Sequence, residues 1–367
     1  MFKLSANGAK IAYNACRKWF TIVSMMIGPV LFVINAPFGR FALNGKSIFL
    51  LDGRKSWIVM ELVSPLMFID TFLNSPLSRG EPVSFEPSLA QYVLAGAYLT
   101  HYLNRAIISP LRTPSRSKSH IIVPLAGVLF NTLNGFLMGT YLSSPAAFAY
   151  LSRSRPTFFV GLSIWAIGFA GNLIHDEILL NIRRKASSKP DGKATRSSGK
   201  TTENEDENIP EHYAIPYGML YKYISYPNYF CEWIEWFGYA LAASPFPFDT
   251  SSLGYAVRAL RSPSIIFAPS SVFAPRLTPP WIFLLNEIVL MLPRAYKGIG
   301  GTKKGSVTRT RRKGRSSCRL YGRLETNTIL RWLFPTVPKC CSRDDLVRRE
   351  VALIDHLFEV FVASCSH

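Results

Sequence analysis

The chain has 367 residues, of which 48% are hydrophobic and only 18% are charged, and its formal net charge is +19. Soluble domains usually carry about 25% charged residues, so the composition argues against a soluble protein and favours an integral membrane protein. Nucleic-acid binding is not expected, because the excess charge is local: nine Lys or Arg and no acid stand between Lys303 and Arg323. Six cysteines without histidines at ligand spacing predict free thiols and no metal site.

Hydrophobic segments recur at about the 20 residues that a membrane-spanning helix needs. The loops between them place 15 Lys and Arg on one side and ten on the other. By the positive-inside rule, the more basic side faces the cytosol, with the 181–227 loop and the C-terminus. We therefore predict an all-α, multi-pass membrane protein with about seven transmembrane helices around a cofactor and substrate cavity, at residues 19–37, 57–74, 89–108, 120–142, 157–180, 228–246 and 279–293.

Two polar stretches interrupt this pattern. Residues 186–211 contain almost nothing to bury and predict a flexible cytosolic loop. From Gly298 onward the chain is basic and lacks a periodic apolar face. We expect 1–297 to form the membrane domain and 298–367 to be a mostly disordered tail.

Polar residues follow one face of the predicted helix at 228–246. In SYPNYFCEWIEWFGYAL, offsets of four and seven place Asn228, Glu232 and Glu235 on the same side of a helix. The remaining faces are aromatic and apolar. This polar stripe on an apolar helix is the inverse of a soluble surface helix.

A second polar stripe lies at the end of the predicted span at 157–180. In GFAGNLIHDEILLNIRRK, Asn172 and Asp176 are four residues apart, and Arg183 returns to the same face eleven residues after Asn172. One stripe alone is also typical of a helix–helix contact. Two stripes that end on the same cytosolic loop favour a polar pocket, because ionisable residues at membrane depth usually line a site. Arginines at its rim suit phosphate, so the pocket fits a nucleotide cofactor.

Three stretches resemble the steroid 5α-reductase (3-oxo-5α-steroid 4-dehydrogenase) family, in a fungal-type form: NLIHDEILLNIRR, YAIPYGMLYKYISYPNYFCEWIEWFGYALA and LPRA. The resemblance covers about 157–297 and is weaker upstream, where SWIVMELVSP, THYLNR and NTLNGFLMGTYL follow the family's order. It implies a seven-helix enzyme of the endoplasmic reticulum membrane that reduces the C=C bond of a steroid or other lipid enone with NADPH. We expect a monomer surrounded by the lipid bilayer.

The resemblance also implies roles for individual residues. Glu61 and Tyr102 hold and polarise the ketone of the substrate, with Trp57 as a pocket wall and Glu232 between cofactor and substrate. Hydride addition to the β-carbon places negative charge on the carbonyl oxygen, to which Tyr102 donates, with Glu61 orienting or protonating it. The residues implied to hold NADPH are Asn172, Asp176, Arg183, Tyr213, Asn228, Glu232 and Arg294.

The chain departs from the family pattern in three places. Met60 and Ala214 stand where the family usually has Gln and Arg. After LPRA, the chain runs into YKGIGGTKKGSVTRTRR in place of an ending that contains a cofactor-binding tyrosine. This abrupt change predicts a frameshift or an unspliced intron in the gene, with weakened NADPH binding and activity as its consequence.

Two other classes of protein stay open at this point. YPNYFCEWIEW also resembles membrane S-adenosylmethionine-dependent methyltransferases that act on isoprenylcysteine or phospholipids. The altered ending is compatible with an inactive pseudoenzyme. Within the reductases, polyprenol and enoyl-CoA substrates compete with steroids.

Overall fold

The computed structural model describes residues 5–34, 37, 48–79, 86–114, 116–153, 155–187, 216–247, 267 and 269–312. The chain divides into two compact units. The first is formed by Met1–Pro247 and Ser262–Gly300, and the second by Phe248–Arg261 and Gly301–His367. Of the second unit, only residues 301–312 are described, so the fold below is that of the first unit.

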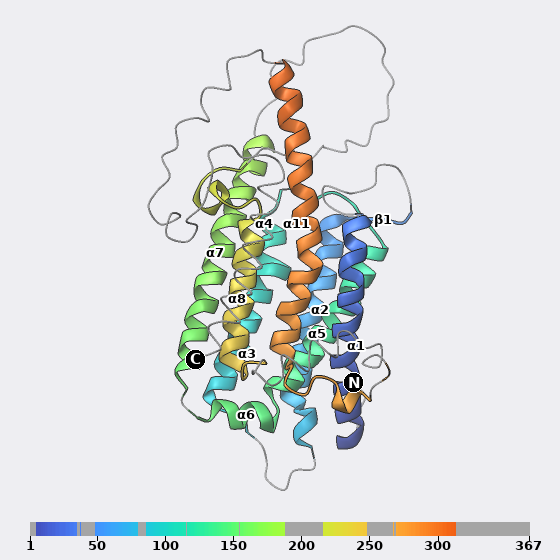
Figure 1. The fold of residues 1–367 in the computed structure, drawn as a ribbon, viewed down its shortest axis with the longest axis vertical. Helices are drawn as coiled ribbons and strands as arrows, with labels where there is room; N and C mark the ends of the chain where they lie inside the picture. Colours follow the sequence, from blue (N-terminus) through green and yellow to red (C-terminus); the bar gives the residue numbers. More distant parts are fainter. Residues whose placement is uncertain are drawn as a thin grey trace, which may run out of the picture. The chain divides into compact units, whose positions relative to one another are not determined.

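The described part of the first unit is almost wholly helical, with its long helices running side by side (Figure 1). Helix α3 (Leu89–Tyr102) continues through a π-helical segment, η3 (Leu103–Ile108), into the single turn α4 (Ser109–Arg112). Strands β1 (Leu50–Leu51) and β2 (Ser119–His120) pair antiparallel, with Leu50 opposite His120. The other helices are α1 (Ala6–Val33), α2 (Gly53–Asn74), η2 (Pro76–Ser78), α5 (Ile122–Leu142), α6 (Pro145–Leu151), α7 (Pro156–Ser187), η4 (Met219–Lys222), α8 (Pro227–Ala243), η5 (Ser270–Val272) and α11 (Pro279–Arg312).

Each of the seven predicted spans falls on one of these helices. Within the described residues, four segments are long and apolar enough to cross a membrane: Ala6–Val33, Gly53–Ser78, Ile122–Leu142 and Pro156–Lys185. Helix α8 has 17 residues, and α3 has 14 before its hydrogen-bonding pattern changes, both short of the roughly 20 that a full crossing needs. The helical membrane class therefore holds, and the full seven-span arrangement stays a prediction.

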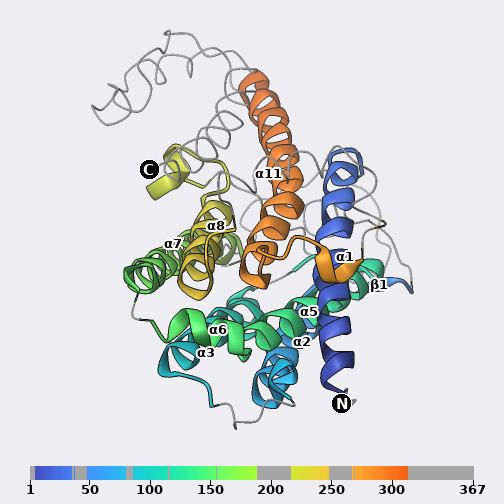
Figure 2. The same cartoon turned by 60° about the horizontal axis from the view of Figure 1, so that its bottom comes forward.

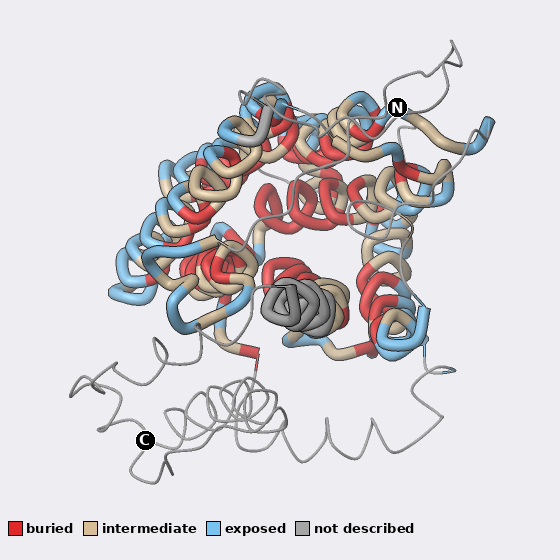
Figure 3. Tube along the Cα trace, turned by 90° about the horizontal axis from the view of Figure 1, so that it is seen from above, coloured by how far each residue is buried: buried red, intermediate tan, exposed pale blue. Residues whose placement is uncertain are grey.

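Buried and exposed residues are distributed as expected for a helix bundle in lipid. Seen along the helices, the buried residues lie on the sides that face one another, and the exposed ones lie outside (Figure 3). Large apolar side chains such as Val59, Phe159 and Ile167 are exposed, whereas Gln91 and Glu235 are fully buried. Polar side chains thus gather inside the bundle, where they can line a site.

Glycines bring two pairs of helices into close contact. A Cβ added at Gly168 of α7 would lie 2.3 Å from the backbone nitrogen of Glu235 on α8. A Cβ at Gly135 of α5 would lie 2.3 Å from the carbonyl oxygen of Ser64 on α2. Small residues let helix backbones approach closely inside membranes. The pairs α7–α8 and α2–α5 are accordingly the most closely packed in the described structure, and Figure 2 shows each pair side by side.

Gly168→Ala is expected to force α7 and α8 apart and to destabilise the protein by about 1–3 kcal/mol, the usual cost of overpacking. Gly96→Ala on α3 is the matched control, because a Cβ there meets nothing within 4 Å. Ala is better than Gly inside a helix by about 0.5–1 kcal/mol, so the control should be as stable as the wild type or slightly more stable. Thermal unfolding in detergent measures both variants; equal melting temperatures would contradict the close α7–α8 contact.

Helix α11 continues past the predicted start of the tail, through Gly298 to Arg312. Extending an existing helix needs no new nucleation, even where the composition is polar. Residues 313–367 lie outside the described residues, as do 188–215, which include most of the predicted loop at 186–211 and the candidate Tyr213.

Candidate active site

A half-buried guanidinium, that of Arg105, joins three helical segments near the centre of the bundle. Arg105 Nε lies 3.2 Å from Glu61 Oε2, and Arg105 Nη1 donates to Glu232 Oε1 at 2.6 Å. Glu61 comes from α2, Arg105 from η3 and Glu232 from α8, and both carboxylates are buried. Buried carboxylates need such a partner, because an unpaired buried charge costs several kcal/mol.

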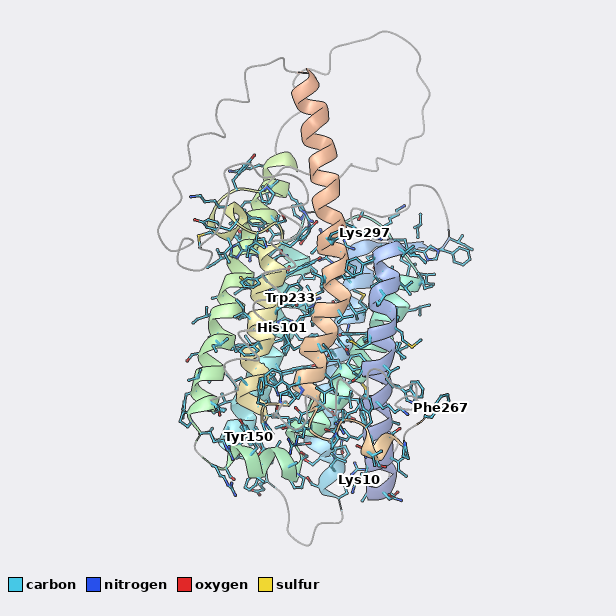
Figure 4. All side chains as sticks on the ribbon, viewed as in Figure 1. Lys10, His101, Tyr150, Trp233, Phe267 and Lys297 are labelled. Carbon is cyan, nitrogen blue, oxygen red and sulfur yellow. The ribbon has the colours of Figure 1, made fainter. Side chains whose placement is uncertain are left out.

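Further ionisable side chains surround this guanidinium. His101, one turn before it on α3, has Nδ1 at 2.7 Å from Glu235 Oε1 and Nε2 at 3.8 Å from Glu232 Oε1. Figure 4 shows His101 roughly midway along the helices. Glu287 of α11 is buried and within electrostatic reach of Arg105. We call these residues the Arg105 cluster: Glu61, His101, Arg105, Glu232, Glu235 and Glu287.

Beside it lies a buried group of uncharged polar residues, the hydroxyl cluster, made of Ser64, Tyr98, Tyr102 and Asn134. Asn134 Nδ2 donates to Tyr102 Oη at 2.9 Å and to Tyr98 Oη at 3.0 Å. The Tyr98 and Ser64 hydroxyls are 2.7 Å apart. All four residues are buried, with at most 2% of their surface exposed. The cluster places the hydroxyl of Tyr102 in surroundings with little access to water.

The two polar stripes predicted from the sequence meet between α7 and α8. Asn228 Nδ2 donates to Asp176 Oδ1 at 3.2 Å, so the two stripes face each other at this point. Asn172 and Glu235 are buried along the same seam. Asn228 Oδ1 is buried and has no hydrogen-bond partner among the described residues. An acceptor left in this way can serve a ligand that carries hydroxyl or amide donors.

Basic and aromatic side chains gather at the end of the bundle where α7 ends. Trp57 Nε1 donates to the carbonyl oxygen of Arg105 at 3.2 Å, and the Arg116 guanidinium lies over the Trp57 ring, 4.1 Å from its centroid. Burial, aided by the like charge of Arg183, lowers the pKa of Arg116 to about 10. Two guanidiniums that repel each other are stabilised by an anion between or beside them. This end of the bundle therefore suits a phosphate.

The structure brings most of the implied site residues together. Glu61, Trp57 and Glu232 surround Arg105, while Tyr102 belongs to the neighbouring hydroxyl cluster. Asn172, Asp176 and Asn228 lie on the α7–α8 seam, Arg183 lies further along α7, and Arg294 lies on α11.

Glu61 and Tyr102, both implied to hold the ketone of the substrate, are not hydrogen-bonded to each other within the described residues. The charged Arg105 attracts the carboxylate instead, and Tyr102 is held by Asn134.

Sequence reasoning missed several members of both clusters. His101 and Arg105 stand four residues apart in THYLNR, inside a predicted span, and ionisable residues at that depth are a signal that could have found them. Asn134 lies in NTLNGFLMGTYL without a charged neighbour, so only the contact with the tyrosines distinguishes it.

Comparisons with known proteins agree with this helical membrane site. A model of the family described as 3-oxo-5-alpha-steroid 4-dehydrogenase matches residues 117–191 and 196–260. The bovine 3-oxo-5-alpha-steroid 4-dehydrogenase 1 is 33% identical over 214 residues, covering 58% of this chain and 72% of the relative. An uncharacterized protein of Schizosaccharomyces pombe is 36% identical over 296 residues, covering 78% of this chain and 91% of the relative. Steroid 5-alpha-reductase DET2 of Solanum lycopersicum is 27% identical over 212 residues, covering 56% and 69%.

The fold, the site and these relatives define the class as a membrane oxidoreductase of steroid metabolism. The chain belongs to the 3-oxo-5-alpha-steroid 4-dehydrogenase family.

Proposed function

We propose that the protein reduces the C=C bond of a lipid enone, with a 3-oxo-Δ4-steroid as the favoured substrate and NADPH as the reductant. The observation that carries the proposal is a buried tyrosine hydroxyl, Tyr102, beside a buried acid–arginine cluster. Such a pair of sites suits a reaction in which negative charge develops on a carbonyl oxygen away from water. The proposal includes a monomer with seven spans in the endoplasmic reticulum membrane, with the 181–227 loop in the cytosol.

NADPH, when bound, supplies the hydride that adds to the β-carbon of the enone. Tyr102 donates its hydroxyl hydrogen to the carbonyl oxygen as the electrons of the C=C bond move toward it. Arg105 offsets the charges of Glu61 and Glu232, which would otherwise repel the developing enolate. The buried site excludes water, so each of these interactions is stronger than in solution.

The described residues fit the hydroxyl, carboxamide and phosphate groups of NADPH. Asn228 Oδ1 is an unused acceptor on the α7–α8 seam, suited to a ribose hydroxyl or a carboxamide. Arg116 and Arg183 supply positive charge at the end of the same seam. The proposed cofactor-binding residues are therefore Asn172, Asp176, Arg183, Tyr213, Asn228, Glu232 and Arg294, to which the structure leads us to add Arg116.

A turnover assay tests this function. Purified protein in lipid is incubated with NADPH and a steroid enone, a polyprenal or an enoyl-CoA, and oxidation of NADPH is followed together with the reduced product. Turnover of the steroid enone supports the proposal, and turnover of only one of the others assigns a different substrate within the reductases. Retention of S-adenosylmethionine without any NADPH oxidation would overturn it in favour of a methyltransferase.

Arg183→Ala is expected to raise the KM for NADPH by about ten- to a hundredfold, the effect of losing one charge-assisted hydrogen bond to a phosphate. The phosphate is remote from the reacting carbon, so kcat should change much less. Arg112→Ala is the matched control, because Arg112 pairs with Glu177 at a partly exposed position. Steady-state kinetics with NADPH and NADH give the comparison, and equal use of the two cofactors by the wild type would refute a phosphate site.

A further inference from the structure

We infer that Asn134 is a positioning residue for the proton donor: it donates to Tyr102 Oη and so leaves the Tyr102 hydrogen for the carbonyl oxygen of the substrate. The inference rests on the proposed function and deepens it, because it identifies what orients the tyrosine. Glu61, the other residue proposed at the ketone, is paired with Arg105.

The direction of the hydrogen bond follows from the chemistry of the two groups. An amide nitrogen carries two hydrogens and can only donate, so Tyr102 Oη is the acceptor at 2.9 Å. The hydrogen of the Tyr102 hydroxyl must then point elsewhere. Ser64 and Tyr98 also contact the Tyr102 hydroxyl, and Tyr98 is the donor in its contact. The tyrosine therefore presents a hydrogen that a ligand can accept.

The neighbouring tyrosine shows why Tyr102 and not Tyr98 has this role. The two rings lie 4.8 Å apart, and Asn134 donates to both hydroxyls. The Tyr98 hydroxyl is also hydrogen-bonded to the hydroxyl of Ser64, at 2.7 Å. Tyr98 gives its hydrogen to its neighbours in the hydroxyl cluster, which leaves the hydrogen of Tyr102 for a ligand.

The backbone packing of α5 against α2 places the amide. Gly135, next to Asn134, lies so close to the Ser64 carbonyl oxygen that no side chain fits between the helices. Asn134 is consequently held at the α2–α5 contact with 1% of its surface exposed. Without competing water, its N–H groups keep the tyrosine oxygens in place.

The same contact assists the proton transfer itself. As the hydride from the reductant adds to the β-carbon, the π electrons of the C=C bond form a double bond between the α-carbon and the carbonyl carbon. The π electrons of the C=O bond move to the oxygen, which takes the Tyr102 hydrogen and gives an enol. Negative charge then remains on Tyr102 Oη until the enol returns its hydroxyl proton to the tyrosine, as the α-carbon takes a proton and the ketone re-forms. The Asn134 N–H already points at this oxygen and stabilises the charge without reorganisation.

Asn134→Leu tests the inference, because leucine has a similar size and no donor. We expect kcat to fall at least about tenfold, as for loss of one hydrogen bond to a charged group, with the KM for NADPH unchanged. Asn131→Leu is the matched control: Asn131 lies one turn earlier on α5, is similarly buried and donates to the Met60 carbonyl oxygen at 2.8 Å. Its kcat should stay within twofold of the wild type.

Two further variants separate positioning from packing. In a Tyr102→Phe background, Asn134→Leu should cause less than a twofold further loss of kcat, since the amide acts through the tyrosine. Asn134→Asp should be active at low pH, where a protonated carboxyl can donate, and should lose activity as the pH rises and the carboxylate accepts the Tyr102 hydrogen. The wild type should lack this pH dependence.

A readout without turnover uses a steroid enone with a ¹³C-labelled carbonyl, bound together with NADP⁺. Its infrared carbonyl stretch should lie at lower frequency in the wild type and in Asn131→Leu than in Asn134→Leu and Tyr102→Phe. Three results would overturn the inference. The first is that Asn134→Leu lowers kcat as much in the Tyr102→Phe background as in the wild type. The second is that Asn131→Leu lowers kcat as much as Asn134→Leu, and the third is that the Asn134→Asp enzyme gains activity as the pH rises. An inactive wild type would overturn the proposed function, whereas an active wild type with an active Asn134→Leu variant would overturn only this inference.

Discussion

Tyr102→Phe is expected to lower kcat by about 10²–10³, the usual effect of removing one donor to a developing oxyanion. The ring is buried and its hydroxyl is hydrogen-bonded to Asn134, so the substitution removes the hydroxyl with little change in packing. The KM for NADPH should change little, because the tyrosine lies on the substrate side of the proposed site. Steady-state kinetics in lipid give both values.

Tyr141→Phe is the control for loss of a buried tyrosine hydroxyl. Tyr141 lies further along α5 and donates to the Ala243 carbonyl oxygen at 3.3 Å, away from both clusters. Its removal should leave kcat within a few-fold of the wild type. Unchanged turnover in Tyr102→Phe would make that tyrosine structural and would require another proton donor.

Arg105→Leu is expected to lower the free energy of unfolding by about 3–5 kcal/mol, the cost of leaving buried carboxylates without their partner. The side chains of Glu61 and Glu232 are only 6% and 5% exposed, so water cannot replace the guanidinium. Thermal unfolding in detergent measures the loss.

Arg112→Leu provides the comparison for a surface ion pair. Arg112 and Glu177 are 45% and 34% exposed, and such pairs contribute about 0–1 kcal/mol. Adding Glu61→Gln and Glu232→Gln to Arg105→Leu should restore much of the lost stability, because the two carboxylates that Arg105 contacts are then replaced by neutral amides. Equal, small losses in both arginine variants would show that the Arg105 cluster does not hold the helices together.

The helices could be predicted from the sequence because apolar runs of about twenty residues have few alternatives in a membrane protein. The change from α- to π-helical hydrogen bonding at Leu103 could not be predicted, because it does not alter the spacing of apolar residues in the sequence. In the same way, the stripe of Asn172 and Asp176 follows from spacing within one helix. The bond between Asn134 and Tyr102 depends on how closely α5 approaches α2, which no single-helix pattern shows.

The π-helical segment between Tyr102 and Ser109 changes the directions in which side chains leave the continuous helix formed by α3, η3 and α4. At its end, the Ser109 N–H bonds to the carbonyl oxygen of Asn104, five residues back instead of four, so the segment holds an additional residue in its turn. Tyr102 can therefore face Asn134 of α5 while Arg105 reaches Glu61 of α2 and Glu232 of α8, and the continuous helix need not kink. Deleting one residue here would leave both flanking helices intact yet rotate the guanidinium away from its carboxylates. The relative orientation of proton donor and ion pair is thus encoded in the length of the chain at this point, and not only in the identity of its side chains.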